Sequence, residues 1–228
     1  MGAQEGLCVI SREQTAGRGR REREWISPLD AGLYFSIVLR PKMEQKHWPL
    51  LTLMASLSVH DALLEACSLE TDIKWPNDVY AGERKLCGIL AETVESDAGR
   101  AVIIGIGINL NDRAFPEELK TVATSVEAES GREVDRERLI ESLVASLLKK
   151  YEALQGPGGA RLILGEWSAR SSYAVDKPVR VELSDEIIEG VTRGLEPDGA
   201  LRVETDGGEI RIIRAGDVTT LRGMERQG

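Results

Sequence analysis

The chain has 228 residues, of which 42% are hydrophobic and 29% charged, and its formal net charge is −9. This composition is typical of a soluble globular protein with one mid-sized domain and a small second one, and it excludes wholesale disorder. No apolar run approaches the roughly 18 residues of a membrane span, and residues 1–6 lack the features of a signal peptide. We therefore expect no membrane as its partner, and because the chain is acidic overall, we expect no nucleic acid as its main partner either.

The cysteines and histidines point away from metal or covalent chemistry. Cys8, Cys67 and Cys87 are odd in number and widely spaced. They suggest neither a disulfide framework nor a zinc site, so a reducing cytoplasm is the expected location. The only two histidines, His47 and His60, fall in or near a predicted helix and are expected to be structural or exposed. With no Ser-His-Asp triad to assemble, we expect chemistry based on positioning and electrostatics.

Short strands and one long helix are predicted in the first third of the chain. Residues 7–11 predict a short buried strand, residues 12–24 a polar and basic loop, and residues 33–39 a second strand that Pro41 stops. A helix is expected after Pro49, because apolar residues recur there at helical spacing: Leu50, Leu53, Met54, Leu57 and Leu64.

A hairpin is predicted near the middle of the chain. Residues 72–75 form a strand that ends at Pro76, and a turn or bend follows at residues 77–78. Residues 79–80 and 86–90 flank a short polar connection, which favours a hairpin.

The clearest helix runs from about residue 135 to residue 154, and the glycine and proline cluster at residues 156–159 ends it. Its apolar stripe consists of Leu139, Ile140, Leu143, Val144, Leu147, Leu148 and Tyr151.

The pattern changes near residue 176. Residues 179–183 alternate in polarity, residues 198–199 and 206–208 are turn signals, and residues 210–213 form another strand. Short strands at this spacing predict a small all-β barrel of about 50 residues.

The first segment with chemical potential is the glycine- and arginine-rich run at residues 14–25. Five arginines lie from Arg12 to Arg23, although the chain as a whole is acidic. Glycines let backbone N–H groups approach an anion, and guanidinium groups match the oxygens of phosphate and carboxylate, so we expect a small anionic ligand. Such a loop is expected to be mobile until its anion arrives, and Trp25 could stack on a nucleobase. The alternative is a solvated surface loop with Trp25 as a core anchor.

The second segment comprises Lys74–Asp78 and Arg84–Leu90. A lysine on a strand beside a glycine, here Lys85, can place its ammonium group in a cleft that no bulky neighbour fills. The alternative is a surface hairpin with a solvated lysine, and Trp75 is expected in the core.

The third segment lies in a predicted strand at residues 101–110. Gly105 and Gly107 alternate with isoleucines and leave one face of the strand bare, so a flat ligand can approach closely, and Asn109 could read the edge of a base. Leu110 stands where the third glycine of a dinucleotide-binding fingerprint would be, and no Walker-A sequence occurs, which excludes a P-loop ATPase. A bulged core strand is the alternative.

In this order, the three segments resemble the signature set of biotin protein ligases. Gln14–Trp25 is similar to the biotin-binding loop of the family, Lys74–Asp78 with Arg84–Leu90 to its central block, and Gly105–Asn109 to its third motif. Gly199–Leu201 resembles the family's C-terminal domain. The related lipoate ligases share the fold but carry different loop sequences, so the resemblance favours biotin.

The resemblance implies an α+β fold, with a mixed or antiparallel sheet flanked by helices as in class II synthetases and a small C-terminal SH3-like β-barrel. The implied domains are a catalytic domain at residues 1–175 and the barrel at residues 176–228.

The resemblance also implies a two-step reaction that uses ATP, Mg²⁺ and biotin. The carboxylate of biotin attacks the α-phosphorus of ATP, and a lysine of the biotin carboxyl carrier protein of acetyl-CoA carboxylase then attacks the biotinyl-adenylate. Lys85 and Arg20 are the implied catalytic residues; metal ligands are not implied. The implied biotin-binding residues are Gln14, Arg18, Gly19, Arg20 and Lys85, and the implied ATP-binding residues are Arg20, Arg23, Trp25, Lys85 and Asn109.

Two features depart from the family pattern. Glu22 stands where the family usually has glycine, inside the loop that must fold over the ligand. The printed sequence begins after the family's Ser-Thr-Asn motif and shows no helix-turn-helix domain, so we expect an N-terminally truncated catalytic part without a repressor role.

Two other functions stay open at this stage. One is a degenerate module that binds biotin or nucleotide without catalysis, and the other is lipoate or octanoate transfer on the same fold. A homodimer is compatible with the family, but the residues leave the oligomeric state undecided.

Overall fold

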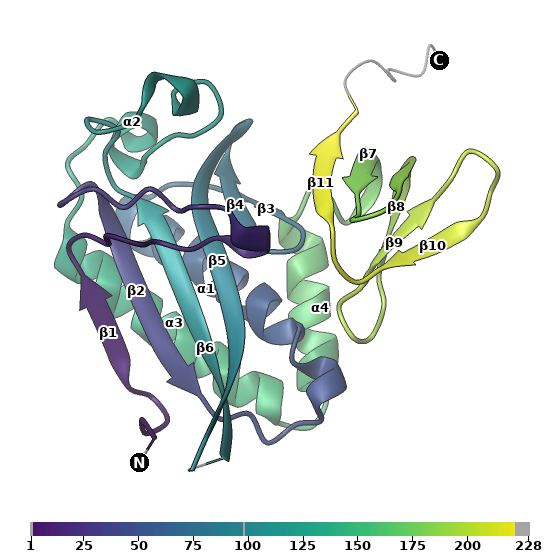
Figure 1. The fold of residues 1–228 in the computed structure, drawn as a ribbon, viewed down its shortest axis with the longest axis horizontal. Coiled ribbons are helices and arrows are strands. Elements are labelled where there is room, and N and C mark those ends of the chain that lie inside the picture. The colour runs from purple at the N-terminus through teal and green to yellow at the C-terminus, as the bar shows by residue number, and fades with distance from the viewer. Residues whose placement is uncertain (1, 98, 222–228) are drawn as a thin grey trace.

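The computed structural model describes residues 2–97 and 99–221 and shows two antiparallel sheets, the larger covered by helices on one face (Figure 1). The larger sheet has the order β1-β2-β6-β5-β4-β3, and each pairing between its neighbouring strands is antiparallel. This confirms the antiparallel form of the predicted α+β class. Its strands are β1 (Cys8–Ser11), β2 (Gly32–Leu39), β3 (Asp72–Lys74), β4 (Asp78–Ala81), β5 (Arg84–Ser96) and β6 (Gly99–Asn109).

The central strands have one face for the core and one for the site. Leu33 and Phe35 of β2 are buried in the apolar core with the helices, as alternation along a strand requires. On the opposite face, the register sets Tyr34 of β2 beside Gly107 of β6, and Gly107 beside Gly88 of β5. The helices are α1 (Leu50–Cys67), α2 (Val126–Ser130), α3 (Arg136–Gln155) and α4 (Gly159–Arg170), with 3₁₀ turns η1 (Arg20–Glu22), η2 (Gln45–His47) and η3 (Glu117–Leu119).

The predicted helix after Pro49 is α1, and it is the main core helix. Contrary to the expectation from the sequence, the stretch Gln45–Cys67 is long and apolar enough to pass for a membrane span. Yet 67% of an 18-residue apolar window of that stretch is buried inside the protein, where α1 packs on the sheet, α3 and α4. His60, on α1, accepts or donates a hydrogen bond at 2.9 Å to Thr71 and is structural, as predicted.

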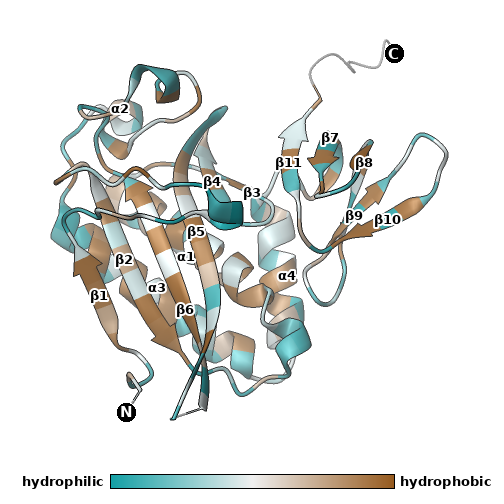
Figure 2. Cartoon of the chain, viewed as in Figure 1, coloured by the Kyte–Doolittle hydropathy of each residue, from teal (hydrophilic) through white to brown (hydrophobic). Residues whose placement is uncertain are grey.

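Several apolar residues lie outside the core, contrary to expectation. The strand at residues 7–11 is not buried: β1, which is coloured hydrophobic in Figure 2, is the edge of the sheet. Leu7, Val9 and Ile10 are 48%, 56% and 45% exposed. Leu64 and Leu148 share the helical spacing of the core stripes but are also exposed. An apolar pattern predicts a face, whereas burial requires a neighbouring element to cover it.

The sequence analysis identified α3 but missed α4. Asp135 caps the N-terminus of α3 by accepting a hydrogen bond from the Arg138 N–H at 3.1 Å, and Gly156 ends the helix as predicted. The chain then turns at Gly158 (φ +76°) and enters α4 at once. A Cβ on Gly159 would lie 2.1 Å from the Ala153 carbonyl oxygen, so this close corner requires glycine.

The smaller sheet is the predicted C-terminal β structure, with the order β10-β9-β8-β7-β11 and a barrel-like form. The turn signals at residues 198–199 and 206–208 are confirmed, since Gly199 and Gly208 have φ values of +84° and +78°. Its strands are β7 (Val175–Glu182), β8 (Ile187–Leu195), β9 (Leu201–Glu204), β10 (Ile210–Ile213) and β11 (Asp217–Thr220). The division into residues 1–175 and 176–228 stays a prediction.

Trp75 joins the two sheets. It is buried, as predicted, and its indole N–H donates a hydrogen bond to the Gly199 carbonyl at 2.9 Å. A Cβ on Gly199 would lie 3.0 Å from Leu50 and 3.2 Å from Leu53 of α1. The loop before β9 is therefore packed closely against the first turn of α1.

This contact predicts the effect of Gly199→Ala. The left-handed backbone alone costs an alanine about 1–2 kcal/mol, and crowding against the buried leucines adds about 1–2 kcal/mol. Gly194→Ala is the matched control, because Gly194 has φ +83° but nothing within 4 Å of its added Cβ. Urea unfolding should show the larger loss for Gly199→Ala, and equal losses would contradict the proposed packing.

Candidate functional site

The arginine-rich loop forms a small hairpin, residues 17–25, which we call the arginine hairpin. The Trp25 N–H donates to the Gly17 carbonyl at 3.0 Å, and the Gly19 N–H donates to the Arg23 carbonyl at 2.6 Å. The hairpin crosses the face of the sheet opposite the helices, with the hydrophilic turn η1 at its tip (Figures 1 and 2). The expected mobility of the loop stays a prediction.

The tip explains why Glu22 is an unusual residue at its position. Arg21 and Glu22 have φ values of 53° and 60°, in the left-handed region that glycine adopts without steric cost. The resemblance placed a glycine at position 22, and the backbone gives a physical reason for it. Glu22 itself is exposed at the tip.

Trp25 lies flat on the bare patch of the sheet. A Cβ on Gly107 would lie 2.4 Å from the indole Nε1, and a Cβ on Gly88 would lie 2.9 Å from Cζ3. The glycines therefore permit the close approach of a flat group, as predicted, but that group is a side chain of the protein itself. The Trp25 Nε1 is buried and has no hydrogen-bond partner among the described residues.

A cavity of about 410 Å³ lies between the arginine hairpin and the sheet. Arg20, Lys85 and Asn109, which the sequence places far apart, lie around this one cavity. Every residue that the sequence analysis named for the site lines it: Gln14, Arg18, Gly19, Arg20, Arg23, Trp25, Lys85 and Asn109. The predicted juxtaposition is confirmed, and the roles of the individual residues stay predictions.

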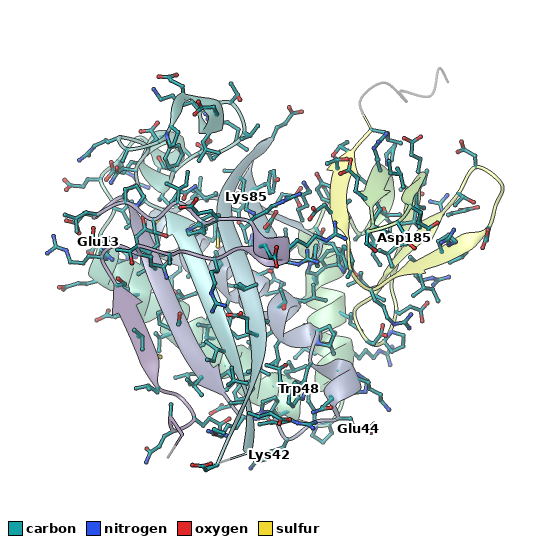
Figure 3. The ribbon with its side chains drawn as sticks, viewed as in Figure 1. Glu13, Lys42, Glu44, Trp48, Lys85 and Asp185 are labelled. Atoms are coloured by element: carbon teal, nitrogen blue, oxygen red, sulfur yellow. The ribbon has the colours of Figure 1, made fainter. Side chains whose placement is uncertain are left out.

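Lys85 stands at the start of β5 beside the hairpin (Figure 3). Its Nζ lies 2.7 Å from Asp78 Oδ1 and 5.5 Å from the centre of the Trp25 ring. Behind Asp78, Lys74 lies 4.8 Å from the ring of Tyr80, and burial lowers the pKa of Lys74. Asp78 is thus the counter-ion of Lys85, a role that the sequence analysis did not assign although it quoted the residue.

The arginines also have protein partners. Arg18 makes a two-point ion pair with Glu92 of β5 at 2.9 and 2.7 Å. Arg20 donates to Asn77 Oδ1 at 3.1 Å, and burial lowers the pKa of its guanidinium group. Arg23 pairs with Asp217 of β11 at 2.6 Å. Neither Glu92 nor Asp217 was predicted for the site, and no sequence signal indicates a partner 194 positions away.

Two polar side chains at the cavity hold the loops that enclose it. Gln14 accepts a hydrogen bond from the Ser27 hydroxyl at 2.8 Å, which ties the segment before the arginine hairpin to the segment after it. The Asn109 amide donates to the Thr124 carbonyl at 2.9 Å. This second bond fixes a segment whose apolar residues form a wall of the cavity, which the sequence analysis did not identify: Phe115, Leu119, Val122 and Ala123.

The described residues contain no cluster of three or more histidine, cysteine, aspartate or glutamate side chains that could hold a metal ion. The cysteines are free thiols in this part of the chain, as expected, and burial raises the pKa of Cys67. The site therefore consists of cations paired with carboxylates around an apolar cavity.

Known proteins that resemble this chain in sequence or structure belong to the family whose motifs the sequence resembles. The chain matches the biotin/lipoate A/B protein ligase family over residues 2–109 and the biotin protein ligase C-terminal domain over residues 175–219. It is 36% identical to a biotin–[acetyl-CoA-carboxylase] ligase of Paracoccus denitrificans over 92% of this chain and 88% of that protein. A biotin protein ligase from Aquifex aeolicus in complex with biotin and ATP superposes with a TM-score of 0.84 at 32% identity, covering 98% of this chain and 92% of that one.

The fold, together with the arginine hairpin and Lys85 around one cavity, defines a member of the biotin and lipoate ligase class. Within that class, the chain belongs to the biotin protein ligase family. It is also 38% identical to the bifunctional ligase/repressor BirA of Bacillus subtilis, and it spans 66% of the length of that protein.

The glycine patch yields a prediction for the site. Gly107→Ala places a methyl group inside the Trp25 indole, so the indole must leave the sheet and the arginine hairpin must shift with it. Gly105→Ala, on the same strand as Gly107, is the control, because the nearest atom to its added Cβ is the Leu90 carbonyl oxygen at 3.7 Å. NMR of the protein labelled with 5-fluorotryptophan leaves the core indoles of Trp75 and Trp167 in place, and the Trp25 resonance should shift for Gly107→Ala alone. An unchanged spectrum would show that Trp25 does not rest on Gly107.

Proposed function

We propose that this chain is an ATP-dependent biotin protein ligase that forms biotinyl-adenylate and transfers biotin to a lysine of a carrier protein. One observation carries the proposal: the cationic hairpin, Lys85 and the glycine patch enclose a single cavity. The biotin and ATP in the Aquifex aeolicus complex are the ligands of a protein with the same fold.

In the first step, the biotin carboxylate attacks the α-phosphorus of ATP, a P–O bond forms, and pyrophosphate leaves. Two anions must approach each other, so the barrier falls only if cations are already in place. The ammonium group of Lys85 would bridge the carboxylate and the α-phosphate, and Arg20 and Arg23 would neutralise the phosphate oxygens. Asp78 holds Lys85 in the cavity before substrate arrives.

In the second step, the carrier lysine attacks the acyl carbon and AMP leaves. The mixed anhydride must be kept from water until then. Gln14, Arg18 and Gly19 would hold biotin, with the hairpin as its cover. The hairpin crosses the cavity and is tied to β5 through Arg18 and Glu92, which supports this shielding role.

Trp25 and Asn109 would bind the adenine. The unpartnered Trp25 N–H can donate to a ligand acceptor and so remove the cost of a buried, unsatisfied donor. The Asn109 amide nitrogen already donates to Thr124, so its Oδ1 would accept from the exocyclic amino group. The apolar wall at Phe115 and Leu119 would cover the ring.

Mg²⁺ would enter with the triphosphate. This ion is usually bound by one or two carboxylates together with phosphate oxygens and waters, so a three-ligand protein site is not needed. Asp78 lines the cavity beside Lys85 and is the carboxylate that would hold the ion.

The carrier protein of a biotin-dependent carboxylase, such as acetyl-CoA carboxylase, is the proposed partner. The name of the Paracoccus relative supports this choice. A cytoplasmic location is supported by the free thiols. Homodimerisation, and the expectation that neither nucleic acid nor membrane is a partner, stay predictions.

The assay is direct. The purified chain is incubated with biotin, Mg-ATP and a carrier domain; biotinyl-adenylate, pyrophosphate and biotinylated lysine are measured by mass spectrometry and a coupled assay. Nucleotide binding without pyrophosphate release would identify a binding module instead. Transfer of octanoate or lipoate in preference to biotin would identify the related ligase activity.

Lys85→Ala should lower the rate of adenylate formation about a hundredfold or more, as expected for the loss of one charge partner in the transition state. Lys149→Ala, which removes an exposed lysine of α3, is the control for net charge and should leave the rate unchanged. An unaltered rate in the Lys85 variant would remove this residue from the mechanism.

A further inference from the structure

The C-terminal sheet holds the tip of the arginine hairpin. Arg20 donates to the Gly216 carbonyl at 3.3 Å, and Arg21 donates to the Glu182 carbonyl at 3.1 Å. The carboxylate of Asp217 lies 2.6 Å from Arg23 and 3.5 Å from Arg21. Three arginines of the hairpin, of which Arg20 and Arg23 line the cavity, thus contact the region where β7 and β11 meet. Figure 1 shows η1 directed toward this side of the molecule.

Asp217 is itself rigidly placed. It is the first residue of β11 and pairs with Glu182 of β7. The preceding Gly216 is packed so closely that a Cβ there would lie 2.8 Å from Val181 and 3.0 Å from Leu183. A carboxylate on a paired strand keeps its position, whereas the hairpin without this contact could adopt many positions. Asp217 therefore sets the geometry of the contact.

The charges require such a carboxylate. Arg20, Arg21 and Arg23 are crowded at the hairpin tip, where they repel one another, and burial of Arg20 adds to the cost. Asp217 offsets this repulsion and also lines the cavity. The Asp217 side chain is only 22% exposed, whereas Arg21 is 36% and Arg23 68% exposed, so solvent screens the attraction in part.

We propose that Asp217 is a positioning residue of the ligase site, through which the C-terminal domain holds the arginine hairpin ready for the triphosphate. The proposal deepens the proposed function and rests on it for the identity of the anion. It makes the C-terminal domain a working part of the phosphate site, since the guanidinium groups are ordered before ATP arrives and less ordering cost falls on binding.

The test compares Asp217→Asn with Glu189→Gln. Asparagine preserves the volume but removes the charge. Glu189 pairs with Arg180 at 3.2 Å in the same sheet, away from the hairpin, so its variant controls for the loss of an ion pair in that domain. Thermal unfolding of both variants identifies any general loss of stability, and Asp217→Glu tests rescue of the charge.

Hydrogen exchange of the ligand-free protein is the first readout. Amides of residues 17–25 should exchange about tenfold faster in Asp217→Asn and at the wild-type rate in Glu189→Gln. Equal exchange in all three proteins would overturn the proposal. This measurement does not depend on enzymatic activity. It therefore tests the contact between Asp217 and the arginine hairpin separately from the proposed function. Failure of the proposed function would appear as a wild-type chain that forms no adenylate.

The kinetic readout is the KM for ATP in adenylate formation. It should rise about tenfold in Asp217→Asn, with a smaller change in kcat, and Asp217→Glu should recover part of the loss. A lower KM would show that Asp217 competes with the phosphate, and a fall in kcat alone would assign it another role; either result contradicts positioning.

Discussion

The absence of side chains at Gly88 and Gly107, adjacent on neighbouring strands, is the constraint on which the site depends. It leaves a surface on which the indole of Trp25 lies flat against the sheet. Because Trp25 ends the arginine hairpin, its position brings the hairpin down over the cavity and sets the indole beside Lys85. A methyl group at either glycine would push the Trp25 indole, and the arginine hairpin with it, away from the sheet.

The second organising feature is electrostatic. An acidic chain with a net charge of −9 concentrates cations in one cavity and gives each a carboxylate or amide partner: Arg18 with Glu92, Lys85 with Asp78, Arg23 with Asp217. Such pairing keeps the cations in place without ligand, at the cost that an incoming phosphate must share or replace these partners. This fits a site in which two anions meet and the cations must be placed beforehand.

The prediction from sequence succeeded where the signal is local. Three segments each have a chemical property that a few neighbouring residues determine: the alternating glycines at residues 105–107, the lysine and glycine of β5, and the arginine run. All three meet at the cavity. It failed where an outcome depends on distant packing. The strand at residues 7–11 is as apolar as a core strand, but it lies at the sheet edge, and α4 follows a glycine corner that looks like a helix end in sequence.

The amino-acid sequence by itself indicated the family, an α+β class with a mixed or antiparallel sheet, and the motif residues that meet at the cavity, because motifs and alternation are carried by short stretches of chain. Only the tertiary structure decided what those residues touch. Strand register and the packing of the C-terminal sheet decide these contacts. They include the ion-pair partners Glu92 and Asp217, the apolar wall at Phe115 and the glycine surface under Trp25. These contacts join residues tens to hundreds of positions apart, so no local pattern encodes them.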